Sequence, residues 1–398
     1  MRHPNPFSPA FGAAPTLFFG RDAYLHIVEG ALANRSDRMR AFFLVSTRGA
    51  GKTVLLHQMA KTAQDAHWEA YEMHAGHAAQ ELYECLDDAR HGQARLQVSP
   101  KLSLPGGASV SGIDATVEPR GGAQTPLLAR ALIERCLRMG RHGGVFIAID
   151  EAQKLSETDV EEICVAVQSA RTQGCDVMLV LAGLPETKHI IAHYKGCTFM
   201  RRAERVVLEV LGKGETRDAF RESFARVPEL AVTGDQIEDL AHYSQGHPYL
   251  VQLLGHYVYE VMSEQYDALL EAGVQTVTPA VSELEEAKRR AMWEYCEDVL
   301  EPVVQGMRTG MLAYLKALCS TMDERGLLHT GADLAAKLGK ADSHELSYYR
   351  QRTIDLCIAK PVGRGTMRFL LPYVPRAFAQ MEMPAALASD DSWDMEVR

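Results

Sequence analysis

A glycine-rich turn between an apolar strand and a helix constrains the fold of this chain more than any other feature. Residues 40–45 (RAFFLV) are an apolar run that predicts a buried strand, and residues 54–66 follow a helical pattern. Strand, glycine-rich turn and helix, in this order, are the context of a phosphate-binding loop. The predicted nucleotide-binding segment comprises Ser46, Thr47, Arg48, Gly49, Ala50, Gly51, Lys52, Thr53 and Val54.

The residue types of this turn suit the binding of a nucleoside triphosphate. Gly49 and Gly51 permit positive φ and a close approach of backbone N–H groups to phosphate oxygens, and the N-terminus of the following helix favours an anion. Lys52 is expected to contact the β- and γ-phosphates, and the Thr53 hydroxyl to ligate Mg²⁺. Ser46 stands at the first glycine of the usual pattern G-x-x-x-x-G-K-[ST], a departure that affects how the strand enters the loop.

Two carboxylates end a second apolar strand. Residues 145–149 (VFIAI) are followed by Asp150 and Glu151. Asp150 is expected to hold the shell of Mg²⁺, and Glu151 to polarise the attacking water as a general base. Without Glu151, a nucleotide could bind without being turned over. The phosphate loop and the acidic pair together predict ATP and Mg²⁺ as cofactors.

Strands and helices alternate up to about residue 212, which predicts an α/β fold with a parallel sheet. Helices are expected at 22–38, 127–139 and 156–172, and a third strand at 176–182. Beyond residue 213 the expected elements are helices, at 215–226, 235–245, 248–265 and 279–301. The predicted organisation is a poorly ordered N-terminus (1–16), an ATPase core (17–212) with an inserted hairpin (94–118), a helical lid with a linker helix (213–304), a small domain (305–380) and an acidic tail (381–398).

The small C-terminal domain has the pattern of a winged helix. Residues 330–339 and 343–356 read as two helices, and residues 359–371 as two strands around a Gly-Arg-Gly turn. Residues 311–380 contain ten Lys or Arg and six Asp or Glu, whereas the whole chain has a net charge of -10. Basic side chains on the second helix and the turn could contact phosphates. These are Arg350, Arg352 and Arg364. Docking on protein is the alternative use of such a domain.

Four further segments carry a family resemblance. Together with the phosphate loop and the acidic strand end, they make residues 15–380 resemble bacterial AAA+/STAND-type P-loop ATPases of the origin-recognition-like clade, which have a helical lid and a C-terminal winged helix. The four segments are residues 18–22 (FFGRD), 181–186 (LAGLPE), 199–205 (FMRRAER) and 244–249 (SQGHPY).

The resemblance implies further site residues. It places Gly20 and Arg21 near the adenine, and Pro248 of the lid against the base or ribose. It also implies an arginine-rich edge that faces a neighbour's nucleotide and could supply an arginine finger; surface arginines in solvent are the alternative. The arginines of this edge are Arg201, Arg202 and Arg205.

Two positions depart from the pattern of fast AAA+ motors. Many of these proteins have Asn, Ser or Thr at the end of the third predicted strand to contact the γ-phosphate, whereas this chain has Ala182 and Gly183. The lid segment GHPYLVQ lacks the arginine found in many other AAA+ lids. Both departures favour slow hydrolysis and a switch-like role.

Composition excludes several other classes of protein. The eight cysteines are scattered without a C-x-x-C pair, so a disulfide framework or zinc ribbon is not expected. No run approaches 18 apolar residues, so no membrane span is expected. These features favour a cytoplasmic protein with reduced thiols.

Three functional hypotheses follow. The first is a slowly hydrolysing ATP-dependent switch. The second is an initiator-like protein that binds DNA under the control of ATP. The third is a nucleotide-dependent signalling or defence scaffold with little turnover, which acts through a protein partner or through self-association.

Overall fold

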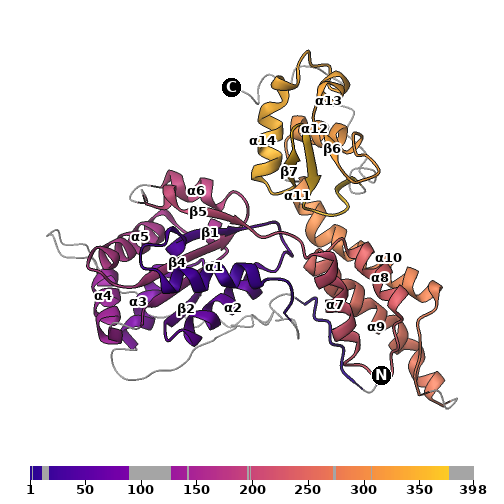
Figure 1. The fold of residues 1–398 in the computed structure, drawn as a ribbon, viewed down its shortest axis with the longest axis horizontal. Helices are drawn as coiled ribbons and strands as arrows, with labels where there is room; N and C mark the ends of the chain where they lie inside the picture. The colour runs from indigo at the N-terminus through magenta and orange to yellow at the C-terminus, as the bar shows by residue number, and fades with distance from the viewer. Residues whose placement is uncertain are drawn as a thin grey trace, which may run out of the picture.

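The computed structural model describes residues 1, 3–10, 18–88, 127–140, 143–194, 197, 199–271, 275–305 and 307–375. Figure 1 shows three regions along the chain: an α/β region up to β5, a helical region from α7 to α10, and a C-terminal region from α12 to β8. The expected inserted hairpin at 94–118 and the acidic tail at 381–398 lie outside the described residues.

The α/β region is built on a parallel sheet. Within the described part of the chain its five strands have the order β2-β3-β4-β1-β5, and all their pairings are parallel. The strands are β1 (Ala41–Val45), β2 (Glu69–His74), β3 (Val145–Asp150), β4 (Val177–Gly183) and β5 (Glu204–Val207). The predicted parallel α/β sheet is therefore confirmed.

Helices cover both faces of this sheet, and successive strand residues serve the two faces alternately. Phe42 and Leu44 of β1 pack in one core with α1 and α2, whereas Phe43 and Val45 pack in a second core with α3, α4 and α5. The helices are α1 (Asp22–Ala33), α2 (Lys52–Asp65), α3 (Ala78–Asp88), α4 (Leu127–Met139), α5 (Glu157–Thr172) and α6 (Thr187–His193). Because both faces are covered, β1, β3 and β4 are buried along their whole length.

Strand β2 and helix α3 were not expected from the sequence. Strand β2 (EAYEMH) lies at one edge of the sheet, where three of its six residues are half buried and two are exposed. An edge strand of this kind carries no continuous apolar run, so periodicity alone does not reveal it. It pairs with β3 in a register that places His74 opposite Asp150.

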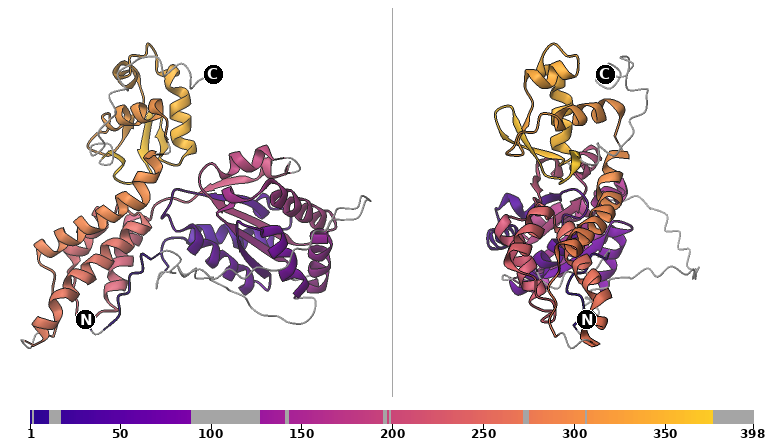
Figure 2. Two further views of the ribbon diagram at one scale, coloured as in Figure 1. Left: turned by 180° about the vertical axis from the view of Figure 1, so that it is seen from behind. Right: turned by 90° about the vertical axis from the view of Figure 1, so that its right-hand side faces the viewer.

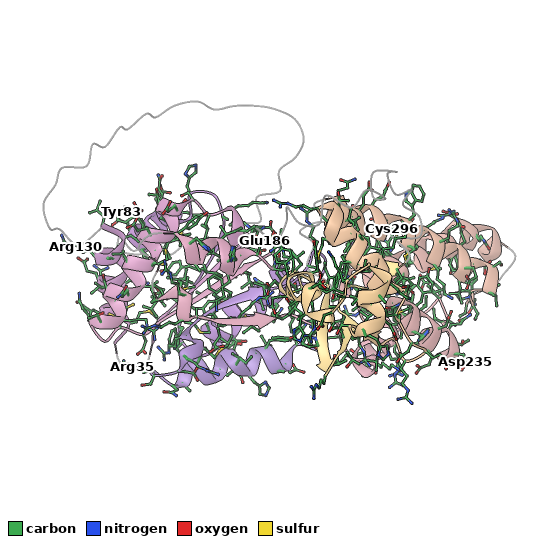
Figure 3. The ribbon with its side chains drawn as sticks, turned by 90° about the horizontal axis from the view of Figure 1, so that it is seen from above. Arg35, Tyr83, Arg130, Glu186, Asp235 and Cys296 are labelled. Atoms are coloured by element: carbon green, nitrogen blue, oxygen red, sulfur yellow. The ribbon has the colours of Figure 1, made fainter. Side chains whose placement is uncertain are left out.

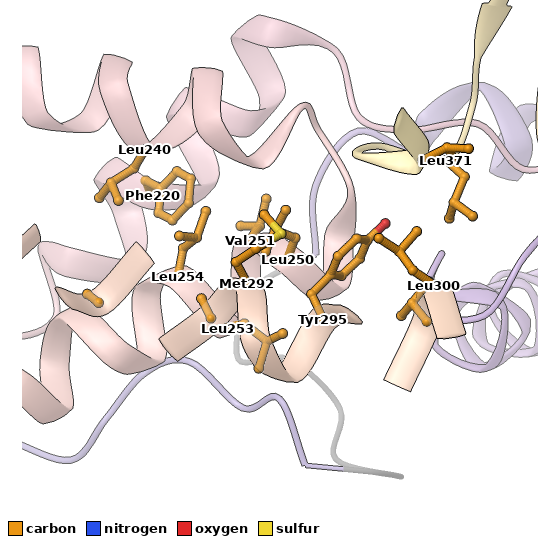
Figure 4. Close-up of a cluster of buried hydrophobic side chains, with 14 of the residues drawn as sticks. Phe220, Leu240, Leu250, Val251, Leu253, Leu254, Met292, Tyr295, Leu300 and Leu371 are labelled. Carbon is orange, nitrogen blue, oxygen red and sulfur yellow. The ribbon is translucent and has the colours of Figure 1, made fainter. Parts of the chain in front are cut away.

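The helical region packs around a single apolar core. Figure 4 shows Phe220, Leu240, Leu254 and Met292 converging between its helices. These are α7 (Lys213–Phe224), α8 (Gly234–Ser244), α9 (Pro248–Glu271) and α10 (Val281–Tyr295). A π-helical turn (Cys296–Leu300) and α11 (Glu301–Gln305) continue α10 toward the C-terminal region (Figure 2). Within the described ranges, no helix has both the length and the apolar character that crossing a membrane requires.

The C-terminal region shares its core with the helical region. Leu300, Tyr314 and Leu371 belong to the same buried cluster as Phe220 and Leu240. The elements are α12 (Thr309–Cys319), β6 (Leu328–His329), α13 (Ala332–Lys337), a 3₁₀ turn (Ser343–Leu346), α14 (Ser347–Asp355), β7 (Ala359–Gly363) and β8 (Thr366–Phe369). The strands form an antiparallel sheet in the order β6-β8-β7. One buried core therefore spans both regions.

The N-terminal segment corrects an expectation. Residues 3–10 lie along the helical region, where Phe7 is 3% exposed and its ring centroid is 4.8 Å from that of Phe224. Gly255 makes room for this ring, since a Cβ there would lie 2.2 Å from Phe7 Cε1. The backbone N–H of His3 donates to Glu229 Oε1 at 2.8 Å. The prediction of a poorly ordered N-terminus was therefore wrong for residues 3–10, because one buried aromatic side chain anchors a segment of otherwise turn-like composition.

Replacing the anchor tests its contribution to stability. Phe7→Ala is expected to lower the free energy of unfolding of the helical region by about 3 kcal/mol, because it removes a buried aromatic side chain and leaves a cavity. Phe7→Leu, which keeps most of the apolar volume, should lose less. Thermal unfolding followed by calorimetry measures both variants. An unchanged midpoint for Phe7→Ala would show that the segment does not stabilise the fold.

Candidate nucleotide-binding site

The loop between β1 and α2 has the backbone geometry of an anion cradle. Gly49 and Gly51 adopt positive φ, 72° and 89°, which glycine reaches without steric cost. Helix α2 begins at Lys52, so its N-terminal N–H groups face the loop. The structure thus places the predicted glycine-rich segment between a buried strand and a helix N-terminus, as the sequence indicated.

Lys52 is buried against the loop itself. Its side chain is 7% exposed, and Nζ donates to the carbonyl oxygens of Ser46 at 3.2 Å and Thr47 at 3.0 Å. Burial lowers the pKa of the Lys52 ammonium, and the nearby carboxylates of Asp150 and Glu151 act in the opposite direction. The cation is therefore held by weak neutral acceptors, which phosphate oxygens could replace.

Thr53 and Asp150 meet between α2 and the end of β3. Thr53 Oγ1 donates to Asp150 Oδ2 at 2.5 Å, although the two residues are 97 positions apart in the sequence. Asp150 is 5% exposed, and its Oδ1 accepts the backbone N–H of Glu151 at 2.8 Å. A buried carboxylate beside a hydroxyl offers the oxygen ligands that Mg²⁺ prefers, so these two residues fit the metal expected of the sequence motif.

Glu151 follows Asp150 in a left-handed backbone conformation with φ of 54°. Positive φ is uncommon for a residue with a side chain, and it turns the chain from β3 into the short 3₁₀ helix Ala152–Lys154. The carboxylate Oε2 accepts from Gln153 Nε2 at 2.9 Å and lies 3.1 Å from Lys154 Nζ. The predicted general base therefore has a defined orientation, which the sequence did not reveal.

The end of β4 lies beside the loop. The backbone N–H of Ser46 donates to the carbonyl oxygen of Gly183 at 3.4 Å. A Cβ at Gly183 would lie 2.3 Å from Thr187 Oγ1 and 2.4 Å from Gln153 Oε1, so no larger residue fits without a shift. Figure 3 labels Glu186, three residues further on, on the side of the α/β region nearest the C-terminal region.

Arg21 braces the loop from the side of α1. It is 5% exposed, and its guanidinium donates to the carbonyl oxygens of Glu209 at 2.6 Å and Ala50 at 3.1 Å. Gly20 before it has φ of 65°. The FFGRD segment thus lies next to the phosphate loop and ties it to the chain that follows β5.

The first turn of α9 closes over the loop. The backbone N–H of Tyr249 donates to the carbonyl oxygen of Gly49 at 3.2 Å, and a Cβ on Gly49 would lie 2.8 Å from Tyr249 Cβ. The adjoining pocket is small, with a free volume of about 10 Å³, roughly the space of one water molecule. It is lined by Ser46, Thr47, Ala50, Leu208, Val210, His247, Pro248, Cys357 and Leu370. Pro248 therefore faces the same pocket as the loop.

His247 is a pocket residue that the sequence analysis missed. It is 1% exposed, and neither ring nitrogen makes a hydrogen bond of good geometry within the described part of the chain, although the backbone of Arg48 approaches the ring. Burial lowers the pKa of His247 to about 3, and the positive charge of Arg21 adds to this effect. The ring is therefore neutral near pH 7. Its position in the G-H-P segment, next to Pro248, is the sequence signal that could have identified it. The sequence analysis assigned a role only to Pro248.

The three arginines after α6 have different surroundings. Arg205 Nη2 donates to the carbonyl oxygen of Asp355 at 2.6 Å and lies 3.3 Å from Cys357 Sγ, so it binds the C-terminal region of its own chain. Arg201 Nε donates to the carbonyl oxygen of Ala192 at 2.9 Å, and both Arg201 and Arg202 are exposed. Lys360 of β7 adds a second link, 2.5 Å from Glu209 Oε2. Arg205 is thus engaged within the chain in this conformation.

Comparison with known proteins agrees with this geometry. Residues 17–180 match the family model described as AAA ATPase domain. No curated protein sequence matches the chain. The chain is similar to the ORC2 protein of Aeropyrum pernix in its ADPNP–ADP complexes, with 11% identity over 93% of this chain and 96% of that chain and a TM-score of 0.54. The ADP form of that protein gives 11% identity, coverage of 96% and 98%, and a TM-score of 0.51.

A third solved structure, Cdc6p from Pyrobaculum aerophilum, has 15% identity over 98% of each chain and a TM-score of 0.43. At such identities the likeness concerns the fold. The chain has the fold of the P-loop AAA+ proteins, and its residues 17–180 match an AAA ATPase domain.

Proposed function

We propose that this chain binds ATP with Mg²⁺ and hydrolyses it slowly, as a conformational switch. The observation that carries the proposal is the meeting of four side chains at the carboxyl end of the sheet: Lys52, Thr53, Asp150 and Glu151. Thr53 and Asp150 are in direct contact, Lys52 is buried beside them, and Glu151 follows Asp150. This set contains a phosphate-binding cation, two metal ligands and a base.

Each side chain has one role in this proposal. Lys52 exchanges the carbonyl oxygens of Ser46 and Thr47 for phosphate oxygens. Thr53 and Asp150 hold Mg²⁺, which when bound supplies positive charge next to the phosphates. Glu151 accepts a proton from the attacking water. Slow turnover is supported by the absence of a polar side chain at Ala182 and Gly183 and of an arginine in the lid segment GHPYLVQ.

The proposed conformational switch is based on the residues of the helical and C-terminal regions that surround the pocket. Tyr249 of the helical region bonds to Gly49 of the loop, and Cys357 and Leu370 of the C-terminal region line the same pocket. The helical and C-terminal regions share one core. A nucleotide that needs more room than the present pocket offers would therefore move both regions together relative to the sheet. We propose that residues 213–304 act as the lid and residues 305–380 as the module whose position reports the nucleotide.

Glu151→Gln tests the enzymatic part. It is expected to bind ATP as wild type does and to hydrolyse it at least about 100-fold more slowly, because the general base is lost. Phosphate release and the binding of a fluorescent ATP analogue measure the two properties. Glu157→Gln, the same change at an exposed site on α5, is the matched control. If wild type and Glu151→Gln both bind ATP and neither turns it over, the chain is a nucleotide-dependent scaffold rather than an ATPase.

Arg205→Ala tests the link between the nucleotide pocket and the C-terminal region. Loss of its charge-assisted bond to the Asp355 carbonyl should loosen this region and speed the release of bound ADP by about 10-fold. Stopped-flow release of a fluorescent ADP measures the rate. Arg202→Ala, at the exposed neighbouring arginine, is the control. Slower hydrolysis with unchanged release would instead identify Arg205 as a catalytic group that acts in another conformation or in an assembly.

DNA binding under the control of ATP is the second candidate function. We propose that α13, α14 and the β7–β8 hairpin act as a winged helix, because the basic side chains expected to contact DNA are accessible on two of these elements. Arg352 on α14 and Arg364 between β7 and β8 are exposed, whereas Arg350 is half buried and its Nε is shielded. Exposed arginines at a helix and an adjoining turn suit contacts with phosphates.

Salt dependence tests this candidate. If Arg352 and Arg364 each contact a phosphate, changing both to Ala should lower the slope of log K against log salt concentration by about 2 and weaken binding to any duplex. Fluorescence anisotropy with a labelled duplex, at several salt concentrations and with ATP present, measures the slope. Lys316→Ala, at an exposed site on α12, is the control. No binding at low salt would remove this candidate and leave a protein partner or self-association as the output.

A further inference from the structure

One side chain links the acidic end of β3 to the end of β4. Gln153 Nε2 donates to Glu151 Oε2 at 2.9 Å, and Gln153 Oε1 accepts the backbone N–H of Leu184 at 3.0 Å. The hydroxyl of Thr187 also lies 3.4 Å from Gln153 Oε1. These contacts join segments about 30 residues apart, and none of the roles assigned above uses them.

The orientation of this amide is determined by its partners. The N–H of Leu184 is a donor, so the oxygen of Gln153 must face it. The amide nitrogen then faces Glu151, whose ionised carboxylate can only accept hydrogen bonds. A glutamate at position 153 would keep the acceptor for Leu184 but would place a second carboxylate against Glu151. The two ends of this side chain can therefore be tested separately.

The location of the link is relevant to hydrolysis. Strand β4 lies between β3 and β1 in the sheet, so its end lies between the acidic pair and the phosphate loop. The carbonyl oxygen of Gly183 accepts the N–H of Ser46, the first residue of that loop. By bonding to both Glu151 and Leu184, Gln153 thus links the carboxylate of Glu151 to the end of β4.

Gly183 has a role in this arrangement. A side chain at this position would collide with both Gln153 and Thr187. The end of β4 has no polar side chain at position 183. The polar side chain of Gln153, from the turn after β3, contacts this strand end instead. Thr187 is fully buried, and its hydroxyl donates to the carbonyl oxygen of Leu184 at 2.6 Å, which fixes the segment that Gln153 contacts.

We infer that Gln153 is a positioning residue for ATP hydrolysis: it orients Glu151 toward the attacking water and couples that carboxylate to the end of β4. The inference rests on the proposed ATPase function. It assigns Gln153 no contact with the nucleotide, so its loss should change the rate of the chemical step and leave binding intact. An orientation error at the base lowers kcat by a large factor without a corresponding change in KM.

Gln153→Glu is the decisive variant, because it keeps the bond to Leu184 and reverses the interaction with Glu151. We expect kcat for ATP to fall by roughly 10- to 100-fold, with KM, the affinity for a fluorescent ATP analogue and the unfolding temperature close to those of wild type. Gln173→Glu, the same change in charge at an exposed site after α5, should behave as wild type. Gln153→Met, which fills the space without either hydrogen bond, should also lose kcat.

The outcomes separate the explanations. Wild-type kcat in Gln153→Glu would overturn the inference and would show that Gln153 merely holds the end of β4. If Gln153→Glu fails to fold or to bind nucleotide, Gln153→Met decides: a lower kcat at unchanged KM supports the inference, and wild-type kcat overturns it. Turnover in wild type that does not depend on Glu151 would overturn the proposed function itself, and that result is visible before any change at position 153.

Discussion

The order of the strands is the constraint on which the rest of the structure depends. Because β1, β4 and β3 are neighbours and parallel, their carboxyl ends emerge side by side at one edge. The phosphate loop, Gly183 and the acidic pair follow these three ends. Residues more than a hundred positions apart, such as Ser46 and Gly183, are then within bonding distance. Every contact proposed for nucleotide chemistry uses this adjacency, and a different strand order would separate the base from the loop.

Much of this edge could be predicted from the sequence, because local signals carry it. The loop is a contiguous segment whose glycines and lysine have defined tasks, and the strands before it and before Asp150 are fully buried apolar runs. The same reasoning failed for β2, whose position at the edge of the sheet removes the apolar run. It also failed at the N-terminus, where Phe7 is a single apolar residue that no periodicity marks, although it fills the space beside Gly255.

The orientation of the site residues could not be predicted, because it depends on partners distant in sequence. The sequence predicted Glu151 as a base, but its hydrogen bond with Gln153 depends on where β4 ends, because Gln153 also bonds to Leu184. Arg205 was recognised as one of three equivalent arginines, but the fold places the end of α14 next to it alone. The types of residue at the site could therefore be predicted from the sequence. Which of several similar residues makes a given contact could be told only from the tertiary structure.

The contact of the helical region with the phosphate loop combines favourable hydrogen bonds with the unfavourable burial of a polar side chain. The N–H of Tyr249 donates to the carbonyl oxygen of Gly49, and the carbonyl oxygen of Gly246 accepts the N–H of Leu211. The start of α9 and the residues before it are therefore tied to the phosphate loop and to the chain that follows β5. Yet His247 is buried there without a hydrogen bond of good geometry among the described residues, although the backbone of Arg48 approaches its ring. A buried polar group that is left unsatisfied costs about 1–3 kcal/mol. A pocket occupant that offers His247 a hydrogen bond removes this cost. An occupant that binds one arrangement of the helical region better than another shifts the balance between them toward the first.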